Sequence, residues 1–246
     1  MKIIISPAKK MNVHTDLLPG NQLPEFLSDT EILYEAIQKL ALAEAKALWN
    51  CNDKLAQLNF QRHAKMDLRQ AMTPALLSYE GLQYQHMAPS VFTREALSYV
   101  EKHLRILSGF YGILKPFDRV TPYRLEFQAP LSVQGKRDLY DFWGDKCYRA
   151  LIDKDRTILN LASKEYSKIV EKYLQPEDRF ITLVFGELVQ GKLRQKGTLA
   201  KMARGEMVRY LAEGQVTDLE QVKAFHTLNY TFTETYSTET TWVFLR

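Results

Sequence analysis

The sequence predicts one mixed α/β domain spanning residues 1–246. Apolar or β-branched segments typical of strands alternate with amphipathic segments typical of helices along the chain. The length allows a sizeable hydrophobic core, and no repeat, low-complexity tract or long linker divides the chain. Hydrophobic residues make up 46% and charged residues 25% of the sequence, which is ordinary for a globular protein.

The N-terminal half begins with a predicted buried strand over Lys2–Ser6, where three consecutive isoleucines precede Ser-Pro. Apolar residues three or four apart predict helices over Thr30–Leu48 and Lys54–Ala64. Leu82–Met87 is interpreted as a short strand. Thr93 is expected to cap a helix whose apolar stripe continues through Leu97, Val100, Leu104 and Leu107.

The C-terminal half repeats this alternation of strands and helices. Strand-like composition predicts a strand at Thr157–Leu161, a hairpin at Phe180–Gln195 and a terminal hairpin joining Leu228–Thr233 to Thr240–Leu245. Apolar periodicity and capping patterns predict helices over Leu139–Ile152, Lys164–Leu174, Leu199–Ala212 and Thr217–Phe225.

The stretch from Arg105 to Phe127 carries four cations, Arg105, Lys115, Arg119 and Arg124, around a turn that contains Gly109 and Gly112. Closely spaced glycines permit a tight turn with free backbone amides, and a helix end beside them favours an anion site. The alternative is that the apolar residues here are core and the glycines only turn the chain.

Three other places combine a loop or helix with cations or a hydroxyl. Lys9 and Lys10 follow the first predicted strand, where ligands often bind in α/β folds, although a solvated turn explains them as well. Ser163 lies between a strand and a helix, as a simple cap or as part of a ligand site. Lys201, Arg204 and Arg209 surround a mid-helix glycine, Gly205, where an anion or another backbone can approach, or where the charges simply face solvent.

Motifs for familiar chemistries are missing. The five histidines have no metal-ligand spacing, and no Walker loop, dinucleotide fingerprint or nucleophile elbow is present, so we expect no metal and no cofactor. Cys51 and Cys147 fit no metal or redox spacing and indicate two reduced thiols. No signal peptide or membrane-length apolar run is visible.

The charge distribution favours a polyanionic partner. The net charge is +4 and the pI about 8.9, which is mildly basic. Residues 192–209 hold six basic side chains and one acid, Glu206, for a local net charge of +5. Cations with the tyrosines Tyr111, Tyr123 and Tyr210 among them suit nucleic-acid backbone and bases, and a set of unrelated solvated charges explains the same pattern.

Several motifs together resemble the YaaA family of bacterial peroxide stress resistance proteins. In chain order they read SPAKK, HLRILSGFYGILKPFDRVTPYRLEF, DLYDFWGD, NLASKEYSK, AKMARGEMVR and VFLR, and they span most of the sequence. The resemblance implies a cytoplasmic protein that limits oxidative damage and is associated with lower unincorporated iron. It also implies a mixed sheet flanked by helices, with a helix-hairpin-helix-like element lining a basic cleft that binds DNA. We place that element at the helix ending near Leu107 and the Ser108–Gly112 hairpin.

The leading hypothesis is therefore a DNA-binding stress protein, expected to be a monomer. Its candidate contacts with nucleic acid are Lys9, Lys10, Arg105, Ser108, Gly109, Tyr111, Gly112, Arg124, Ser163, Lys201, Arg204 and Arg209. The alternative is an enzyme acting on nucleic acid or a nucleotide by base-excision or lyase chemistry. In that hypothesis Lys9 is the Schiff-base amine and Glu126 the general base, provided that both lie in one cleft.

Overall fold

A mixed β-sheet forms the centre of the molecule. A computed structural model describes residues 1–14 and 18–246. The sheet has the strand order β11-β12-β9-β8-β1-β5-β6, with β10 added beside β9. Its strands are β1 (Lys2–Ile5), β5 (Leu104–Ser108), β6 (Gly112–Leu114), β8 (Thr157–Asn160), β9 (Arg179–Val189), β10 (Lys192–Arg194), β11 (Thr231–Phe232) and β12 (Thr241–Leu245).

The middle of the sheet is parallel. β1 pairs with β5 on one side and β8 on the other, and β9 pairs in parallel with β8 and β12. Ile3, Ile4 and Ile5 are fully buried, as expected for a central strand covered on both faces. Only β6, β10 and β11 pair antiparallel within this sheet, among the residues described. The mixed α/β prediction is confirmed.

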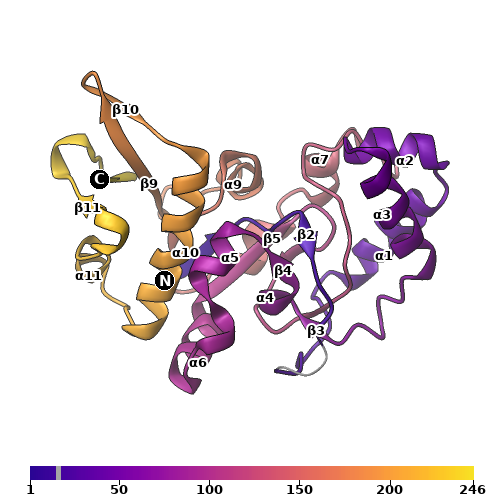
Figure 1. Ribbon diagram of the computed structural model, residues 1–246, viewed down its shortest axis with the longest axis horizontal. Coiled ribbons are helices and arrows are strands. Elements are labelled where there is room, and N and C mark those ends of the chain that lie inside the picture. Colours follow the sequence, from indigo (N-terminus) through magenta and orange to yellow (C-terminus); the bar gives the residue numbers. More distant parts are fainter. Residues whose placement is uncertain (15–17) are drawn as a thin grey trace.

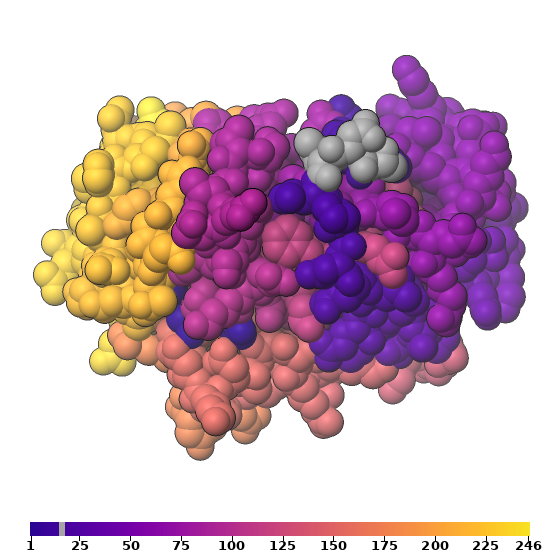
Figure 2. All heavy atoms as spheres, turned by 90° about the horizontal axis from the view of Figure 1, so that it is seen from below, coloured from indigo at the N-terminus to yellow at the C-terminus, as the bar shows by residue number. Residues whose placement is uncertain are grey.

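Helices surround the sheet and connect many of its strands. They are α1 (Leu27–Gln38), α2 (Leu42–Trp49), α3 (Asp53–Lys65), α4 (Ala75–Ser78), α5 (Leu82–Met87), α6 (Arg94–His103), α7 (Leu139–Trp143), α8 (Lys146–Leu151), α9 (Lys164–Glu171), α10 (Gly197–Glu213) and α11 (Leu219–Lys223). Helices α1, α2 and α3 lie at one end of the molecule, and β10, β11 and α11 lie at the other (Figure 1). The space-filling view shows the same order, from purple N-terminal helices to yellow C-terminal residues (Figure 2).

Short elements complete the fold. Two small antiparallel pairs join β2 (Lys10–Met11) to β4 (Tyr79–Glu80) and β3 (Thr73–Pro74) to β7 (Arg119–Val120). Single 3-10 turns occur at Pro89–Val91, Thr227–Asn229 and Glu234–Tyr236. The buried apolar side chains, from Met1 to Phe244, form one continuous core cluster.

The structure corrects the prediction for the stretch before Gly109. The helix does not continue to Leu107: α6 ends at His103 and the chain enters β5 at once. Ser108 and Gly112 pair across a β-hairpin between β5 and β6, so strands flank the turn where a helix-hairpin-helix-like element was predicted. The cause is long-range pairing, because Leu104 and Ile106 are held beside Ile3 and Ile5 of β1.

Three further differences are local. Leu82–Met87 is helix α5 and not a strand. The predicted helix over Thr30–Leu48 divides into α1 and α2, with Lys39 the C-cap of α1 and Ala41 the N-cap of α2. The predicted helix over Leu139–Ile152 divides at Gly144, which has a positive φ of 52°.

Candidate nucleic-acid interface

A cleft of about 410 Å³ lies where β1 and β8 end. Because the two strands are parallel neighbours, the loops that follow their carboxyl ends meet at one edge of the sheet. Helices α5 and α10 and the start of α9 complete the walls. The lining residues are Ser6, Pro7, Ala8, Lys9, Lys10, Glu80, Gly81, Leu82, Gln83, Tyr84, Ser163, Glu165, Tyr166, Lys201 and Arg204.

Two serines join the loops at the base of the cleft. The backbone amide of Ser163 donates to Ser6 Oγ at 2.8 Å, and the two hydroxyl oxygens are 3.3 Å apart. Tyr84 of α5 donates its hydroxyl to the Ser6 carbonyl at 3.0 Å. Ser163 occupies the N-cap position of α9, but its side chain accepts no capping hydrogen bond. The hydroxyl is therefore part of the cleft, and the simple-cap alternative for Ser163 is wrong.

Helix α10 reaches the cleft because Gly205 lets it pack tightly on α5. A Cβ at residue 205 would lie 2.1 Å from the Gln83 carbonyl oxygen and 2.9 Å from the Met87 nitrogen. Gly205 therefore admits another backbone, which was one of the alternatives for this position. The close approach brings Arg204, which directly precedes Gly205, and Lys201, one turn earlier on α10, into the wall of the cleft.

Arg204 is a cation without a counter-ion in this wall. No carboxylate within residues 1–14 and 18–246 lies at ion-pair distance from its guanidinium, and its buried Nε atom has no hydrogen-bond partner there. Burial lowers the pKa of Arg204, yet an arginine stays charged in proteins. An unpaired, partly desolvated cation is unfavourable until an anion joins it.

Two of the three lysines that line the cleft are paired with carboxylates. Lys9 Nζ lies 2.8 Å from Glu126 Oε2, and Lys10 Nζ lies 2.7 Å from Glu80 Oε1. Lys201 has no ion-pair partner within the described part of the chain. The lining thus holds four cations against two carboxylates, Glu80 and Glu165, which leaves a formal charge of +2.

A second hollow of about 400 Å³ adjoins the first through Lys9. Arg124 donates its Nε to the Trp49 carbonyl at 3.2 Å and lies 3.4 Å from Glu126. Gly109 makes room for this segment, because a Cβ there would lie 2.6 Å from the Leu125 carbonyl oxygen. Lys9, Arg124 and Glu126 therefore lie together in this hollow. The enzyme hypothesis requires this proximity of Lys9 and Glu126.

At the glycine turn, Ser108 and Tyr111 lie in the core and are bonded to other groups of the protein. Ser108 Oγ accepts the amides of Phe110 and Tyr111 at 3.2 and 2.9 Å and contacts the Tyr123 hydroxyl at 2.6 Å. Ser108 and Tyr111 are at most 1% exposed. Gly112 has a positive φ of 73°, and a Cβ there would lie 2.8 Å from the Trp143 ring. The core alternative describes Ser108, Gly109, Tyr111 and Gly112 correctly.

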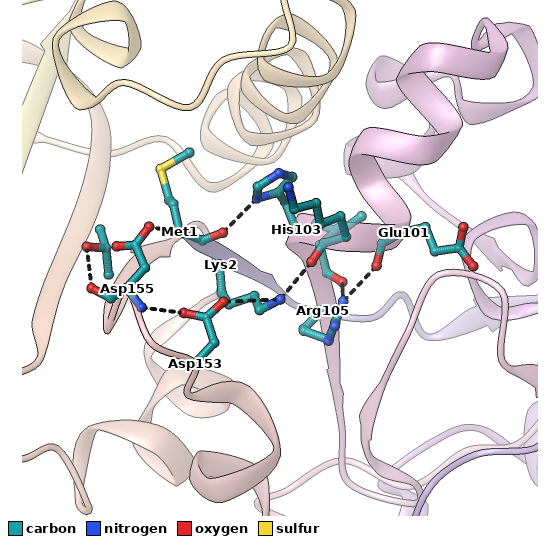
Figure 3. A network of polar contacts seen from close by, with 10 residues as sticks. Met1, Lys2, Glu101, His103, Arg105, Asp153 and Asp155 are labelled. Atoms are coloured by element: carbon teal, nitrogen blue, oxygen red, sulfur yellow. Dashed lines mark hydrogen bonds and ion pairs between the residues drawn. The ribbon is translucent and has the colours of Figure 1, made fainter.

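Arg105 of β5 pairs with Ile4 of β1, and its side chain contacts the end of α6 and does not line the cleft. It is 8% exposed and donates to the carbonyls of Glu101 and Leu104 at 3.0 and 2.6 Å. Figure 3 shows it beside a network in which Lys2 contacts Asp153 at 3.4 Å. Arg105 does not join Lys9 in the cleft. Arg209 also lines neither hollow and pairs with Glu213 at 2.8 Å.

Glu165 is the half-buried carboxylate of the cleft. Burial is the largest cause of its raised pKa, and the neighbouring charge of Glu126 acts in the same direction. Such a group is a candidate proton donor near a bound ligand.

Within residues 1–14 and 18–246, no cluster of three or more His, Cys, Asp and Glu side chains is arranged to hold a metal ion. None of the helices described there is long and apolar enough to cross a membrane.

Comparison with known proteins decides the family. The family model described as peroxide stress protein YaaA matches residues 1–236. The chain belongs to the YaaA family of peroxide stress proteins. Relatives named UPF0246 protein come from Lachnoclostridium phytofermentans, 52% identical over all of this chain and 96% of the relative, and from Agathobacter rectalis, 51% identical over all of this chain and 99% of the relative. A third, from Desulfitobacterium hafniense, is 52% identical over all of this chain and 98% of its own length.

Sequence reasoning missed the α5 side of this YaaA-family cleft. Leu82 and Tyr84 line it, but Leu82–Met87 was interpreted as a short strand. Leu82–Met87 contains no β-branched residue and is rich in Leu, Gln and Met, which favour helix. That composition was the available signal. Ser6 was also overlooked, since nothing local distinguishes it from an ordinary residue at a strand end.

Proposed function

We propose that this YaaA-family protein binds DNA through the cleft between β1, β8, α5 and α10. The contacts are made to phosphates and do not depend on sequence. The observation that carries the proposal is the Arg204 guanidinium, which has no counter-ion in the described chain and faces a cleft that also holds Lys9, Lys10 and Lys201. Two serine hydroxyls supply neutral donors beside these cations.

In this proposal the role of the family in peroxide stress is exercised at DNA. The protein acts in the cytoplasm as a monomer and helps to limit iron-dependent oxidative damage. The family match supports the stress role, and the cleft chemistry supports a polyanionic partner. The link to iron rests on the family resemblance alone.

Titration of a fluorescently labelled duplex at two salt concentrations tests the proposal. Replacing the two cations that have no described ion-pair partner, in Lys201→Ala/Arg204→Ala, should weaken binding by at least about tenfold at low salt, since hydrogen bonds to charged groups contribute about 1.5–3 kcal/mol. Arg69→Ala is the control, because Arg69 is exposed, pairs with Glu31 at 2.8 Å and lines neither hollow. No binding by the wild-type protein, or equal affinity of the double variant, overturns the proposal.

The second candidate is an enzyme acting on nucleic acid, favoured by the 2.8 Å approach of Lys9 Nζ to Glu126. A carboxylate beside an amine can accept its proton, but it also stabilises the ammonium form that cannot attack a sugar carbon. Borohydride trapping on duplex with an abasic site separates the two functions. A covalent adduct that disappears in Lys9→Ala and persists in Lys102→Ala, outside the cleft, supports lyase chemistry; absence of an adduct excludes it.

A further inference from the structure

The size of the cleft limits which part of a DNA molecule can enter it. A volume of about 410 Å³ falls near the lower end of the range of small-ligand pockets, about 300–1,000 Å³. A single unpaired nucleotide, and not a base-paired segment, matches a pocket of this class.

The lining residues are of two chemical kinds. The Ser6 and Ser163 hydroxyls with Lys201 and Arg204 suit a phosphate group. Pro7, Ala8 and Leu82 offer apolar contact without a charge. A nucleotide combines the same two kinds of chemistry, an anionic phosphate and a flat, weakly polar base.

Hydrogen bonds within the protein position the serine residues of the cleft. Ser6 and Ser163 are fixed by the 2.8 Å hydrogen bond between them, and the Tyr84 hydroxyl fixes the Ser6 backbone. Arg204 directly precedes Gly205, where α10 packs on α5, and its buried Nε has no partner within the described chain. A cation in a recess favours a ligand that brings its own negative charge into that recess.

We propose that the cleft takes one unpaired nucleotide together with its phosphate. The inference rests on the proposed function and specifies which part of the DNA enters. Two sources supply this chemistry: a nucleotide extruded from within a duplex, which is easiest at a mismatch, and a nucleotide at a strand end or free in solution. The phosphate contacts Arg204 and the serine hydroxyls, and the base lies against Leu82 and Ala8.

Duplexes containing 2-aminopurine test the proposal, because this base fluoresces strongly once it is unstacked. One duplex carries it at an interior mismatch and another at a strand end, and anisotropy of a second label reports total binding. We expect at least a twofold fluorescence rise with the wild-type protein in one or both duplexes. A rise in the interior duplex identifies an extruded nucleotide as the source, and a rise in the end-labelled duplex identifies the strand terminus.

Two pocket variants and two matched controls make the result specific. Arg204→Met removes the charge but keeps an unbranched apolar side chain, and Leu82→Trp enlarges an apolar lining residue so that it fills the cleft; both should abolish the fluorescence rise. Arg69→Met and Leu58→Trp change exposed residues that line neither hollow and should retain it. A rise that survives both pocket variants overturns the assignment to this cleft.

Calorimetry with a deoxynucleoside monophosphate, the matching deoxynucleoside and inorganic phosphate provides the second arm. We expect the monophosphate to bind at least tenfold more tightly than either fragment, and Arg204→Met to remove the difference. Equal affinity for monophosphate and inorganic phosphate overturns the inference, because the base would then contribute nothing. If the wild-type protein binds duplex but gives neither signal, only this inference fails; if it does not bind duplex at all, the proposed function fails.

Discussion

Gly205 is the position at which a single methyl group should disturb both the fold and the cleft. An alanine Cβ would lie 2.1 Å from the Gln83 carbonyl oxygen, whereas ordinary contact begins at 3.4 Å. The two helices must therefore separate locally by about 1.3 Å, the difference between these values. The clashing atoms belong to the α5 backbone, so no side-chain rotation relieves the contact.

The free energy of unfolding should fall by about 2 kcal/mol in Gly205→Ala. Overpacking of a tight interior site costs about 1–3 kcal/mol, and a backbone clash belongs at the upper end of that range. The intrinsic preference of a helix for alanine over glycine offsets about 1 kcal/mol. For a chain of this size, 2 kcal/mol corresponds to a fall in Tm of about 4–8 °C.

Urea unfolding followed by circular dichroism measures the change, and duplex titration measures its effect on binding. Gly197→Ala is the matched control, because it lies on the same helix and no described atom lies within 4 Å of its added Cβ. The control should be neutral or slightly more stable. Separation of α10 from α5 should also displace Arg204 and weaken DNA binding. A Gly205→Ala protein as stable as Gly197→Ala would refute the packing argument.

Three other predictions concern charge and burial. The slope of log K against log salt for duplex binding should be smaller in magnitude by about 1.8 in Lys201→Ala/Arg204→Ala, at about 0.9 per phosphate contact; an unchanged slope would contradict it. Burial lowers the pKa of His63 to about 4, so the unfolded chain binds more protons below pH 6.5 and stability falls as the pH falls from about 6.5 to about 4. At pH 5 this loss is about 2 kcal/mol in the wild-type protein and should be absent from urea unfolding of His63→Phe; equal losses in both proteins would rule out His63 as the source. Burial raises the pKa of the Cys147 thiol and Cys51 is partly exposed, so a thiol reagent should modify Cys51 in the native protein and both cysteines in urea, and rapid native labelling of Cys147 would count against this.

Elements defined by local pattern were predictable from the sequence. The isoleucine run of β1, the strand-like run of β9 and the two-faced periodicity of α10 each lie within a short window. Part of the site followed from them, because loops after parallel strands meet at one sheet edge. Lys9, Lys10, Ser163, Lys201 and Arg204 were all nominated on local grounds, and all line one cleft.

The errors came from contacts that no local window contains. Leu97, Val100, Leu104 and Leu107 fit helical spacing, yet the last two belong to a strand paired with residues near position 3. A strand buried on both faces shows a continuous apolar run, which a helical pattern can mimic. Because the helix was predicted to continue to Leu107, Arg105 and the glycine turn were also placed wrongly.

The hydroxyl pair in the cleft illustrates the same limit. Ser6 and Ser163 lie 157 positions apart and bond only because β1 and β8 are neighbours. Likewise, the absence of a counter-ion at Arg204 within the described chain depends on how α10 packs against α5. Sequence indicates which residues carry charge, but strand order and helix packing decide which charges stay unpaired.

A crystal structure of the protein with a short oligonucleotide tests the central claim most directly. The account predicts a phosphate oxygen at hydrogen-bond distance, about 2.7–3.2 Å, from the Arg204 guanidinium, with Ser6 or Ser163 as a second donor. Oligonucleotide bound on another surface, with the cleft between α5 and α10 free of phosphate, would contradict it.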